Sequence, residues 1–518
     1  MTAFANYLRS ETRSSERKSR QGKNKKAGAD GNLLFFSNFE SGNLHAVKTL
    51  NSGFEYEIWL RPDTLAEQYR NWFYFSVCNC QANQRVVLSI VNFSKQRSLY
   101  RDRMTPIVRS RSRSHLGWQR IPSRNCFYYK SPRHGGCYLL SFLFTFDTDE
   151  NDVYDFAYSF PYTYTHLQKY LGDLERKTMP FFRRELLCRS NQRRRVDIVR
   201  ISDAGSPGKS SRPPKKAVHG LPGKFVKKGP GCPTQGALGA AGKRPVVVIT
   251  GRVHPGETPS SHVVHGFLEF CTSNHEDAVY LRRAVDIVVV PMLNPDGVFA
   301  GNYRTDSTGV DLNRRWESPS RDLEPSLYYT RRTILEIARD ETKRVDIFID
   351  VHSHSTSKRS FVFCNPPRPT GSASDAKSEA LENDALMNKL KRVLLFLELL
   401  DMHITEFSFA TCRWDIDAHK QGCARRSLER LLPDTLCYTF EASNFHNIEG
   451  LGNGSAPFSG GARNSRVNGP QQGDGGPCEI NTEKSYEHMG HQLGRALAYY
   501  YKSLESPGLR ALLKKTCP

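Results

Sequence analysis

The first part of the chain alternates short apolar or aromatic runs with polar turns. The runs lie at 54–60, 72–77, 85–93, 126–130 and 137–146, and Gly, Asn, Ser and Pro residues separate them. Short runs with this spacing and punctuation are typical of an all-β sandwich. We therefore predict an N-terminal β-sandwich domain over residues 32–165.

Beyond residue 243 the apolar positions form longer, continuous segments. Those with the character of strands buried on both faces lie at 245–250, 285–293, 345–351, 361–363 and 435–440. Helical patterns lie at 260–283, 325–343, 378–402 and 483–504. Buried strands that alternate with helices indicate an α/β domain with a largely parallel or mixed sheet, in which active sites lie at the carboxyl ends of strands. We assign this domain to residues 166–505, joined to the sandwich near Thr165.

Three segments are too polar or too rich in Gly and Pro to build a core, and we expect them to be exposed and flexible. They are a basic arm at 1–31 and insertions at about 204–243 and 450–477; a short tail at 506–518 follows the last predicted helix. The arm lacks the apolar segment of a secretory signal. No apolar run reaches the roughly 18 residues of a membrane span. We therefore expect a soluble, cytoplasmic protein with no membrane partner.

Net charge and cysteine content indicate the kind of partner and the cellular compartment to expect. The 74 Lys and Arg residues exceed the 53 Asp and Glu residues, for a net charge of +21, which favours polyanionic partners. The 13 cysteines are an odd number and are scattered, so they predict neither a zinc ribbon nor a regular disulfide framework. Reduced thiols in a cytosolic protein are the expectation.

A possible metal-binding pair follows the strand at 245–250. His254 and Glu257 stand three apart in a Gly/Pro turn, where an imidazole nitrogen and a carboxylate oxygen can face one zinc ion and leave room for a third ligand and water. The same spacing occurs at His403/Glu406 and His446/Glu449, for which we favour an ordinary helix-end pair and a loop pair. Only the first pair lies at the end of a buried strand.

The third ligand and a general base are expected at other strand ends. His352 and His354 follow the strand at 345–351, and the residues alone do not decide between them. Glu441 ends the strand at 435–440, where a carboxylate can act as base for a zinc-bound water. Arg304 and Arg314 could bind a carboxylate or stabilise an oxyanion, although most arginines in so basic a chain are surface charges.

These residues occur in the order found in zinc metallocarboxypeptidases. The order is His254/Glu257, Asn-Pro-Asp-Gly at 294–297, Asn313-Arg314, His352 and Glu441. The flanking sequence resembles the cytosolic carboxypeptidase branch, whose members remove glutamates from tubulin tails. The motif Phe-Glu-Ser-Gly-Asn-Leu at 39–44 and Phe-Pro-Tyr-Thr-Tyr at 160–164 resemble the N-terminal β-sandwich of that branch. The resemblance covers roughly residues 39–445, apart from the insertions.

The resemblance implies a role for each matching residue. His254, Glu257 and His352 would be the ligands of one Zn²⁺, with His354 a neighbour, and Glu441 the base. Asn313 and Arg314 match the residues that hold the terminal carboxylate of the substrate. Arg304 matches the oxyanion-stabilising arginine. Arg425 resembles the basic residue that receives an acidic side chain in this branch. Cys423-Ala424 stand before it where the branch usually has Thr-Gly.

The function predicted from the sequence is removal of C-terminal or side-chain glutamates from acidic protein tails, with tubulin and microtubules as the expected partner. A monomer is expected, located in the cytoplasm or at the cytoskeleton or a cilium or flagellum. Two alternatives are a catalytically silent module that binds acidic tails and a zinc amidohydrolase of small N-acyl amino acids. Nucleic-acid binding through the basic segments is a third, but no RNA- or DNA-binding motif supports sequence-specific recognition.

Overall fold

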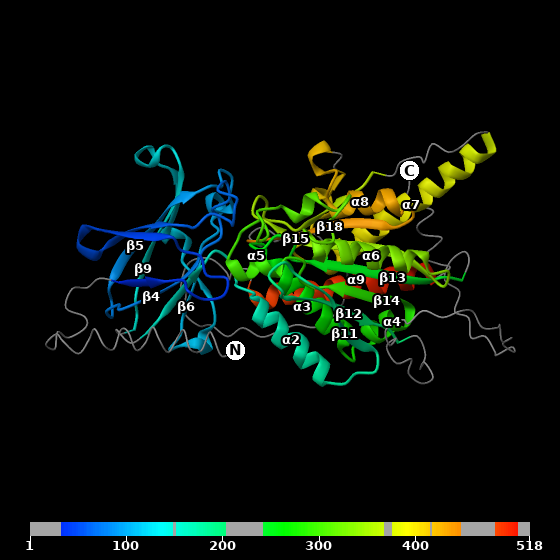
Figure 1. Cartoon of the computed structure of the whole chain (residues 1–518), viewed down its shortest axis with the longest axis horizontal. Helices are drawn as coiled ribbons and strands as arrows, with labels where there is room; N and C mark the ends of the chain where they lie inside the picture. The colour runs from blue at the N-terminus through cyan, green and yellow to red at the C-terminus, as the bar shows by residue number, and fades with distance from the viewer. Residues whose placement is uncertain are drawn as a thin grey trace, which may run out of the picture.

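The computed structural model describes residues 33–148, 152–203, 242–366, 376–414, 417–446 and 482–505. The predicted arm, the tail and the insertion at 450–477 lie outside these ranges, as does the insertion at 204–243 except for its last two residues. Figure 1 shows a strand-rich unit beside a larger unit of strands and helices. In the described part of the chain, no helix is long and apolar enough to cross a membrane.

The N-terminal unit consists of two five-stranded sheets. The first has the order β1 (Leu34–Phe36), β4 (Tyr74–Cys78), β10 (Tyr154–Ala157), β6 (Ile107–Ser110) and β7 (Gln119–Arg120). The second has the order β2 (Ala46–Leu50), β3 (Glu55–Trp59), β5 (Arg85–Phe93), β9 (Tyr138–Thr145) and β8 (Cys126–Lys130). All pairs are antiparallel except β3 with β5. Buried residues alternate along β3 and β5, as the period of a strand requires.

Aromatic side chains fill the space between the two sheets. Phe75 of β4 stacks on Phe156 of β10, with ring centres 5.6 Å apart, and Phe142 of β9 lies 5.9 Å from Phe156. All three side chains are fully buried. Rings packed from both sheets give the unit a single apolar core, which confirms the predicted sandwich fold.

The second unit is built on an eight-stranded mixed sheet. The strand order is β11 (Phe182–Arg189), β12 (Arg195–Ile201), β14 (Asp286–Val290), β13 (Arg244–Gly251), β15 (Lys343–His354), β18 (Leu436–Ser443), β16 (Phe361–Cys364) and β17 (Arg413–Trp414). The four central strands are parallel, and antiparallel pairs flank them. This arrangement confirms the predicted α/β fold class.

Helices cover both faces of this sheet (Figure 1). They are α2 (Tyr164–Arg176), α3 (Thr258–Thr272), α4 (Glu276–Ala284), α5 (Pro295–Ala300), α6 (Pro325–Arg339), α7 (Ala376–His403), α8 (Ala424–Leu431) and α9 (Glu483–Glu505). Val247 and Ile249 of β13 pack in the core cluster with α3 and α9, whereas Val246 and Val248 pack in the cluster with α6 and α8. Because both faces of β13 are buried, its sequence is a continuous apolar run. Helices α3 and α9 approach so closely that a Cβ on Gly266 would lie 1.8 Å from the Glu487 carbonyl oxygen.

Several element boundaries differ from the sequence prediction. The helix predicted at 260–283 is two helices, because Ser273 is extended and His275 begins α4 by accepting a hydrogen bond from the Asp277 N–H. The helix predicted at 325–343 ends at Arg339. Strands β15 and β18 continue past the predicted ends because they pair with each other as far as His354 and Ser443. His352 and Glu441 therefore lie within strands and are direct partners in the sheet.

The sandwich is joined to the α/β unit through the turn that follows α5. Ser41 Oγ donates to the Val298 carbonyl, and Asn43 Nδ2 donates to the Gly301 carbonyl. Gly301 has a left-handed φ of 74°, and a Cβ there would lie 2.5 Å from the Gly42 carbonyl oxygen, so the two backbones meet directly. The Phe-Glu-Ser-Gly-Asn-Leu motif thus builds the contact between the two units.

Candidate active site

The turn after β13 places His254 and Glu257 at the carboxyl end of the strand. Buried Arg252, with a left-handed φ of 55°, holds this turn: its Nε donates to the Pro255 carbonyl, and its Nη1 donates to Tyr162 O and Ser261 Oγ. Burial lowers the pKa of Arg252 to about 9. The fixed turn keeps the imidazole and the carboxylate on the same side of the backbone.

His254, Glu257 and His352 come together although His352 lies 95 residues beyond Glu257. Their nearest donor atoms all lie within 4.8 Å of one another. His254 Nδ1 lies 2.7 Å from Glu257 Oε1, and His352 Nδ1 lies 3.0 Å from Glu257 Oε2. The Ser353 N–H also donates to Glu257 Oε2, at 3.0 Å. The Nδ1 atoms of both rings thus face the same carboxylate.

A second carboxylate orients each histidine. His254 Nε2 lies 3.1 Å from Asp311 Oδ1, and His352 Nε2 lies 2.7 Å from Asp350 Oδ2. Asp350 is itself fixed, since Thr250 Oγ1 donates to its Oδ1 at 2.7 Å. A carboxylate on one ring nitrogen keeps the proton there and leaves the lone pair of the other nitrogen for a metal. Two imidazoles and one carboxylate arranged in this way fit the three protein ligands of a catalytic zinc site.

The charges of this cluster depend on one another. Burial raises the pKa of Glu257, but the two facing imidazoles outweigh it and hold the pKa well below its usual value. Burial lowers the pKa of His352, yet Asp350 and Glu257 hold it well above its usual value. The group therefore concentrates negative charge around the two imidazoles, which suits a cation.

Glu441 projects from β18 beside this cluster. It is the partner of His352 in the sheet and lines the same cavity as His254 and Glu257. Burial raises the pKa of Glu441 to about 7; the His352 imidazole opposes this shift, and the Glu257 charge adds to it. A carboxyl group that exchanges its proton near neutral pH is suited to general acid and base chemistry.

Arg304 reaches the cavity from the turn after α5. Its Nε lies 2.9 Å and its Nη2 lies 2.8 Å from Asp311 Oδ2, so Asp311 orients both Arg304 and His254. The backbone of this turn is held from the sandwich. Asp63 accepts hydrogen bonds from the N–H groups of Tyr303, Arg304 and Thr305, at 2.6, 2.7 and 2.9 Å.

Asn313 and Arg314 lie in the short 3₁₀ helix η7 (Leu312–Arg314), which also borders the cavity. Asp311 caps this helix by accepting from the Asn313 N–H, and Asn313 Oδ1 accepts from the Ala424 N–H at 3.1 Å. Arg314 is exposed. The hydrogen bond between Asn313 and Ala424 joins η7 to the first residue of α8. The residues predicted to bind the terminal carboxylate, Asn313 and Arg314, are therefore adjacent to the helix that carries Arg425.

Arg425, the second residue of α8, is buried, with 1% of its surface exposed. Its Nη1 donates to the Cys364 carbonyl at 2.7 Å and to Asn365 Oδ1. The cavity that it lines measures about 290 Å³ and extends to His254, His352 and Glu441. Among the described residues, six basic side chains line this cavity and two carboxylates, those of Glu257 and Glu441. The basic residues are Lys95, Arg304, Arg314, Arg413, Lys420 and Arg425.

The remaining His/Glu candidates lie elsewhere. His403 ends α7 and packs against Tyr499, and His446 Nδ1 lies 2.6 Å from the Lys358 carbonyl; Glu449 falls outside the described residues. His354 turns away from Glu257: its Nε2 lies 3.1 Å from the Arg359 carbonyl, and its ring packs on Phe361. Of the two histidines left open by the sequence, His352 is the one in the cluster.

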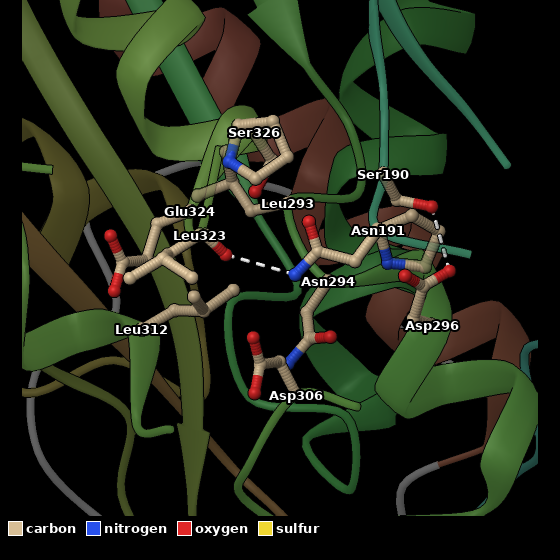
Figure 2. Close-up of a pocket in the computed structure, with 12 residues that line it drawn as sticks. Ser190, Asn191, Leu293, Asn294, Asp296, Asp306, Leu312, Leu323, Glu324 and Ser326 are labelled. Carbon is tan, nitrogen blue, oxygen red and sulfur yellow. Dashed lines mark hydrogen bonds between the residues drawn. The ribbon is translucent and has the colours of Figure 1, made fainter. Parts of the chain in front are cut away.

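The Asn-Pro-Asp-Gly motif lies at a second, smaller pocket, where Figure 2 shows Asn294 and Asp296. Asn294 Oδ1 accepts from the Gly297 N–H at the start of α5. Asp296 accepts from Ser190 Oγ at 2.7 Å and pairs with Arg194 at 2.8 Å, which fastens α5 to the β11–β12 turn. The adjoining cavity measures about 20 Å³, room for about one water molecule. The motif therefore holds the helix that precedes the turn carrying Arg304.

Four residues of the site are not among the sequence candidates. Asp311 precedes Asn313 by two residues, and Asp350 precedes His352 by two residues. In a strand, residues two apart lie on the same face, so a carboxylate at this spacing from a candidate histidine ligand could have identified Asp350. Asp63 and Lys95 give no such signal. They lie in the sandwich, 241 and 208 residues from Arg304 and Tyr303, the residues they contact.

Comparison with known proteins agrees with this geometry. Residues 167–358 match the family of zinc carboxypeptidases, and residues 35–158 match the N-terminal domain of cytosolic carboxypeptidases. Cytosolic carboxypeptidase 6 of Homo sapiens is 37% identical over 473 residues, which is 91% of this chain and 79% of the human protein. The chain belongs to the cytosolic carboxypeptidases. The protein of the same name from Caenorhabditis elegans is 35% identical over 93% of this chain and 90% of its own.

Solved structures give the same fold. A metallo-carboxypeptidase from Burkholderia cenocepacia aligns with a TM-score of 0.66 at 18% identity, over 91% of this chain and 99% of the bacterial one. Family membership makes this chain a metallocarboxypeptidase, of a family of zinc enzymes.

Proposed function

We propose that this metallocarboxypeptidase binds one Zn²⁺ through His254, Glu257 and His352 and removes glutamates from acidic protein tails. One observation carries the substrate assignment: the buried side chain of Arg425 lines the same cavity as these three residues. A buried arginine favours an acidic side chain by charge-assisted pairing and disfavours neutral ones. The excess of basic groups around the cavity supports the same choice.

The terminal residue of the substrate would lie between η7 and α8. Asn313 and Arg314 would bind its free carboxylate, which restricts cleavage to the last residue of a chain. Arg425 would bind its side-chain carboxylate. Because the Ala424 N–H is bonded to Asn313 Oδ1, these two contacts are held at a fixed spacing. Fixed positioning of both carboxylates orients the scissile bond.

The reaction would be hydrolysis of the last peptide or isopeptide bond. A bound zinc ion acts as a Lewis acid and lowers the pKa of water. Glu441 would take a proton from the attacking water and give it to the leaving amine, a cycle that suits its pKa of about 7. Arg304, held by Asp311 and by the Asp63 contacts, would donate to the oxygen of the scissile carbonyl as negative charge develops there.

We expect His352→Ala to lose the metal and His354→Ala to retain it. Removing one of three ligands leaves an incomplete donor set, whereas His354 lies outside the cluster. Zinc per chain, measured by inductively coupled plasma mass spectrometry after dialysis, should fall from one to near zero only in the first variant. Equal retention by both variants would contradict the assigned ligand set.

We expect Arg425→Gln to remove the preference for a C-terminal glutamate. A hydrogen bond to a charged group contributes about 1.5–3 kcal/mol, so kcat/KM for a peptide ending in Glu should fall roughly 10–100-fold. The slower cleavage of the same peptide ending in Gln should be unchanged. Steady-state kinetics on this peptide pair measure both.

Arg426→Gln is the matched control, since Arg426 is the next residue of α8 and donates to the Asp417 carbonyl at the surface. It should keep the preference. If Arg425→Gln slowed both peptides equally, Arg425 would be a structural residue and the acidic specificity would have another source.

The physiological partner we propose is an acidic protein tail such as that of tubulin, in the cytoplasm or at the cytoskeleton. The resemblance of the sequence to its branch and the net charge of +21 support this choice. We propose that a single chain suffices for activity, because every residue assigned above comes from one chain.

A further inference from the structure

Lys95 belongs to the sandwich but lines the cavity of the proposed active site. It follows β5, and its Nζ donates to Tyr303 Oη at 3.0 Å and to Ser355 Oγ. Both contacts cross from the sandwich to the α/β unit. Nearby, the Leu99 N–H donates to the Ser355 carbonyl at 3.0 Å, which fixes the segment that carries Lys95 against the rim of the cavity.

No carboxylate among the described residues forms an ion pair with the ammonium of Lys95. Its two hydrogen-bond partners are neutral hydroxyls, although partly buried charges are normally paired with an opposite charge. An ammonium has three N–H donors, so one remains after these two contacts. Burial lowers the pKa of Lys95, but its interactions with Tyr303, Tyr158 and the Glu257 carboxylate raise it above its ordinary value.

The position of Lys95 relative to the proposed substrate decides which group it meets. In the proposed function the terminal residue would lie against the wall formed by Asn313, Arg314 and Arg425. Tyr303 directly precedes Arg304, and Ser355 lies three residues after His352, so the wall they form with Lys95 borders the scissile bond. The wall formed by Lys95, Tyr303 and Ser355 would therefore face the penultimate residue of the substrate, on the other side of the scissile bond.

We propose that Lys95 binds the side-chain carboxylate of the penultimate residue of the substrate. The inference rests on the proposed function and deepens it: the enzyme would select two successive acidic residues, with Arg425 reading the last and Lys95 the one before. Each cation comes from a different unit of the chain. The sandwich would then contribute directly to specificity.

Two peptides that differ only in the penultimate residue, Glu-Glu and Gln-Glu at the C-terminus, test this with purified full-length protein. We expect wild-type kcat/KM to favour Glu-Glu by about tenfold, as one charge-assisted contact implies. Lys95→Met should bring the ratio close to one by slowing Glu-Glu cleavage, mainly through KM, and leave Gln-Glu unchanged. Lys95→Arg should restore part of the preference.

Lys48→Met is the control, because it removes the same charge from exposed strand β2 of the same sandwich. It should keep the wild-type ratio. An unchanged ratio in Lys95→Met, an equal change in Lys48→Met, or equal slowing of both peptides would each overturn the role of Lys95 while the proposed function stands. Cleavage of neither peptide by the zinc-loaded wild type would refute the proposed function, and this subsite with it.

Discussion

Glu441→Gln is expected to lower kcat by roughly 10²–10⁴-fold, the usual contribution of a positioned general base. Glutamine has the shape of glutamate, so the pairing of β18 with β15 and the packing of the cleft should persist. The amide cannot take a proton from water. Single-turnover kinetics with a peptide ending in glutamate measure the loss, and KM should change little because Glu441 is not assigned to binding.

Two controls separate this effect from indirect ones. The zinc content of Glu441→Gln should equal that of the wild type, since Glu441 is not in the ligand cluster. Glu185→Gln, on exposed strand β11, should retain full activity. Retention of more than a tenth of the wild-type kcat by Glu441→Gln would mean that another group is the base.

Asp63→Asn is expected to lower kcat about 100-fold although Asp63 lies outside the cavity, because a displacement of about 1 Å in a catalytic group can have that effect. Its carboxylate accepts from three successive N–H groups at residues 303–305. The side-chain amide of Asn would place an NH₂ group, itself a donor, against some of these backbone N–H groups. The turn at residues 303–305 would then lose part of its hydrogen bonding. Arg304 would then no longer be aimed at the developing oxyanion, whereas Asn313, Arg314 and Arg425 stay in place, so KM should hold.

Asp155→Asn provides the comparison for Asp63. Asp155 is equally buried in the sandwich and pairs with Arg109 and Arg111 at 2.9 and 2.8 Å. Among the described residues, its hydrogen-bond and ion-pair partners all belong to the sandwich. Its loss should lower the melting temperature and leave kcat of the folded protein unchanged. If the two variants lost kcat in proportion to their melting temperatures, Asp63 would only stabilise the sandwich.

The sequence predicts best those features that repeat locally. Uniform apolar runs gave the strands β13, β15 and β18, and helical periodicity gave α7 and α9 to within two residues. The break between α3 and α4 was not predicted, because the helical backbone is interrupted at Ser273 and His275 while the apolar pattern of the sequence continues. Strands β11 and β12 were not predicted, because arginines and a polar turn make up much of residues 182–201 and hide the apolar pattern of a strand.

The residues of the proposed active site likewise include some that local sequence identifies and some that it does not. His254 and Glu257 are recognisable because they are three apart in one turn, and Asp350 because it precedes His352 by two. The roles of Asp63 and Lys95 depend on the docking of the two units, and nothing local in the sequence marks which sandwich residues contact the segments around the cavity. The residues alone do not decide between His352 and His354, because both are near a strand end. The resemblance implied His352, and in the structure it is the His352 ring that faces Glu257.

The most direct test of the central claim is mass spectrometry of a peptide ending in several glutamates after incubation with the zinc-loaded protein. A matched peptide ending in neutral residues and the Glu441→Gln variant run in parallel. We predict stepwise loss of glutamate residue masses from the acidic peptide only, and none with the variant. Both peptides intact after incubation with wild-type protein that holds its zinc would contradict the claim, and would favour a silent binding module or an amidohydrolase of small molecules.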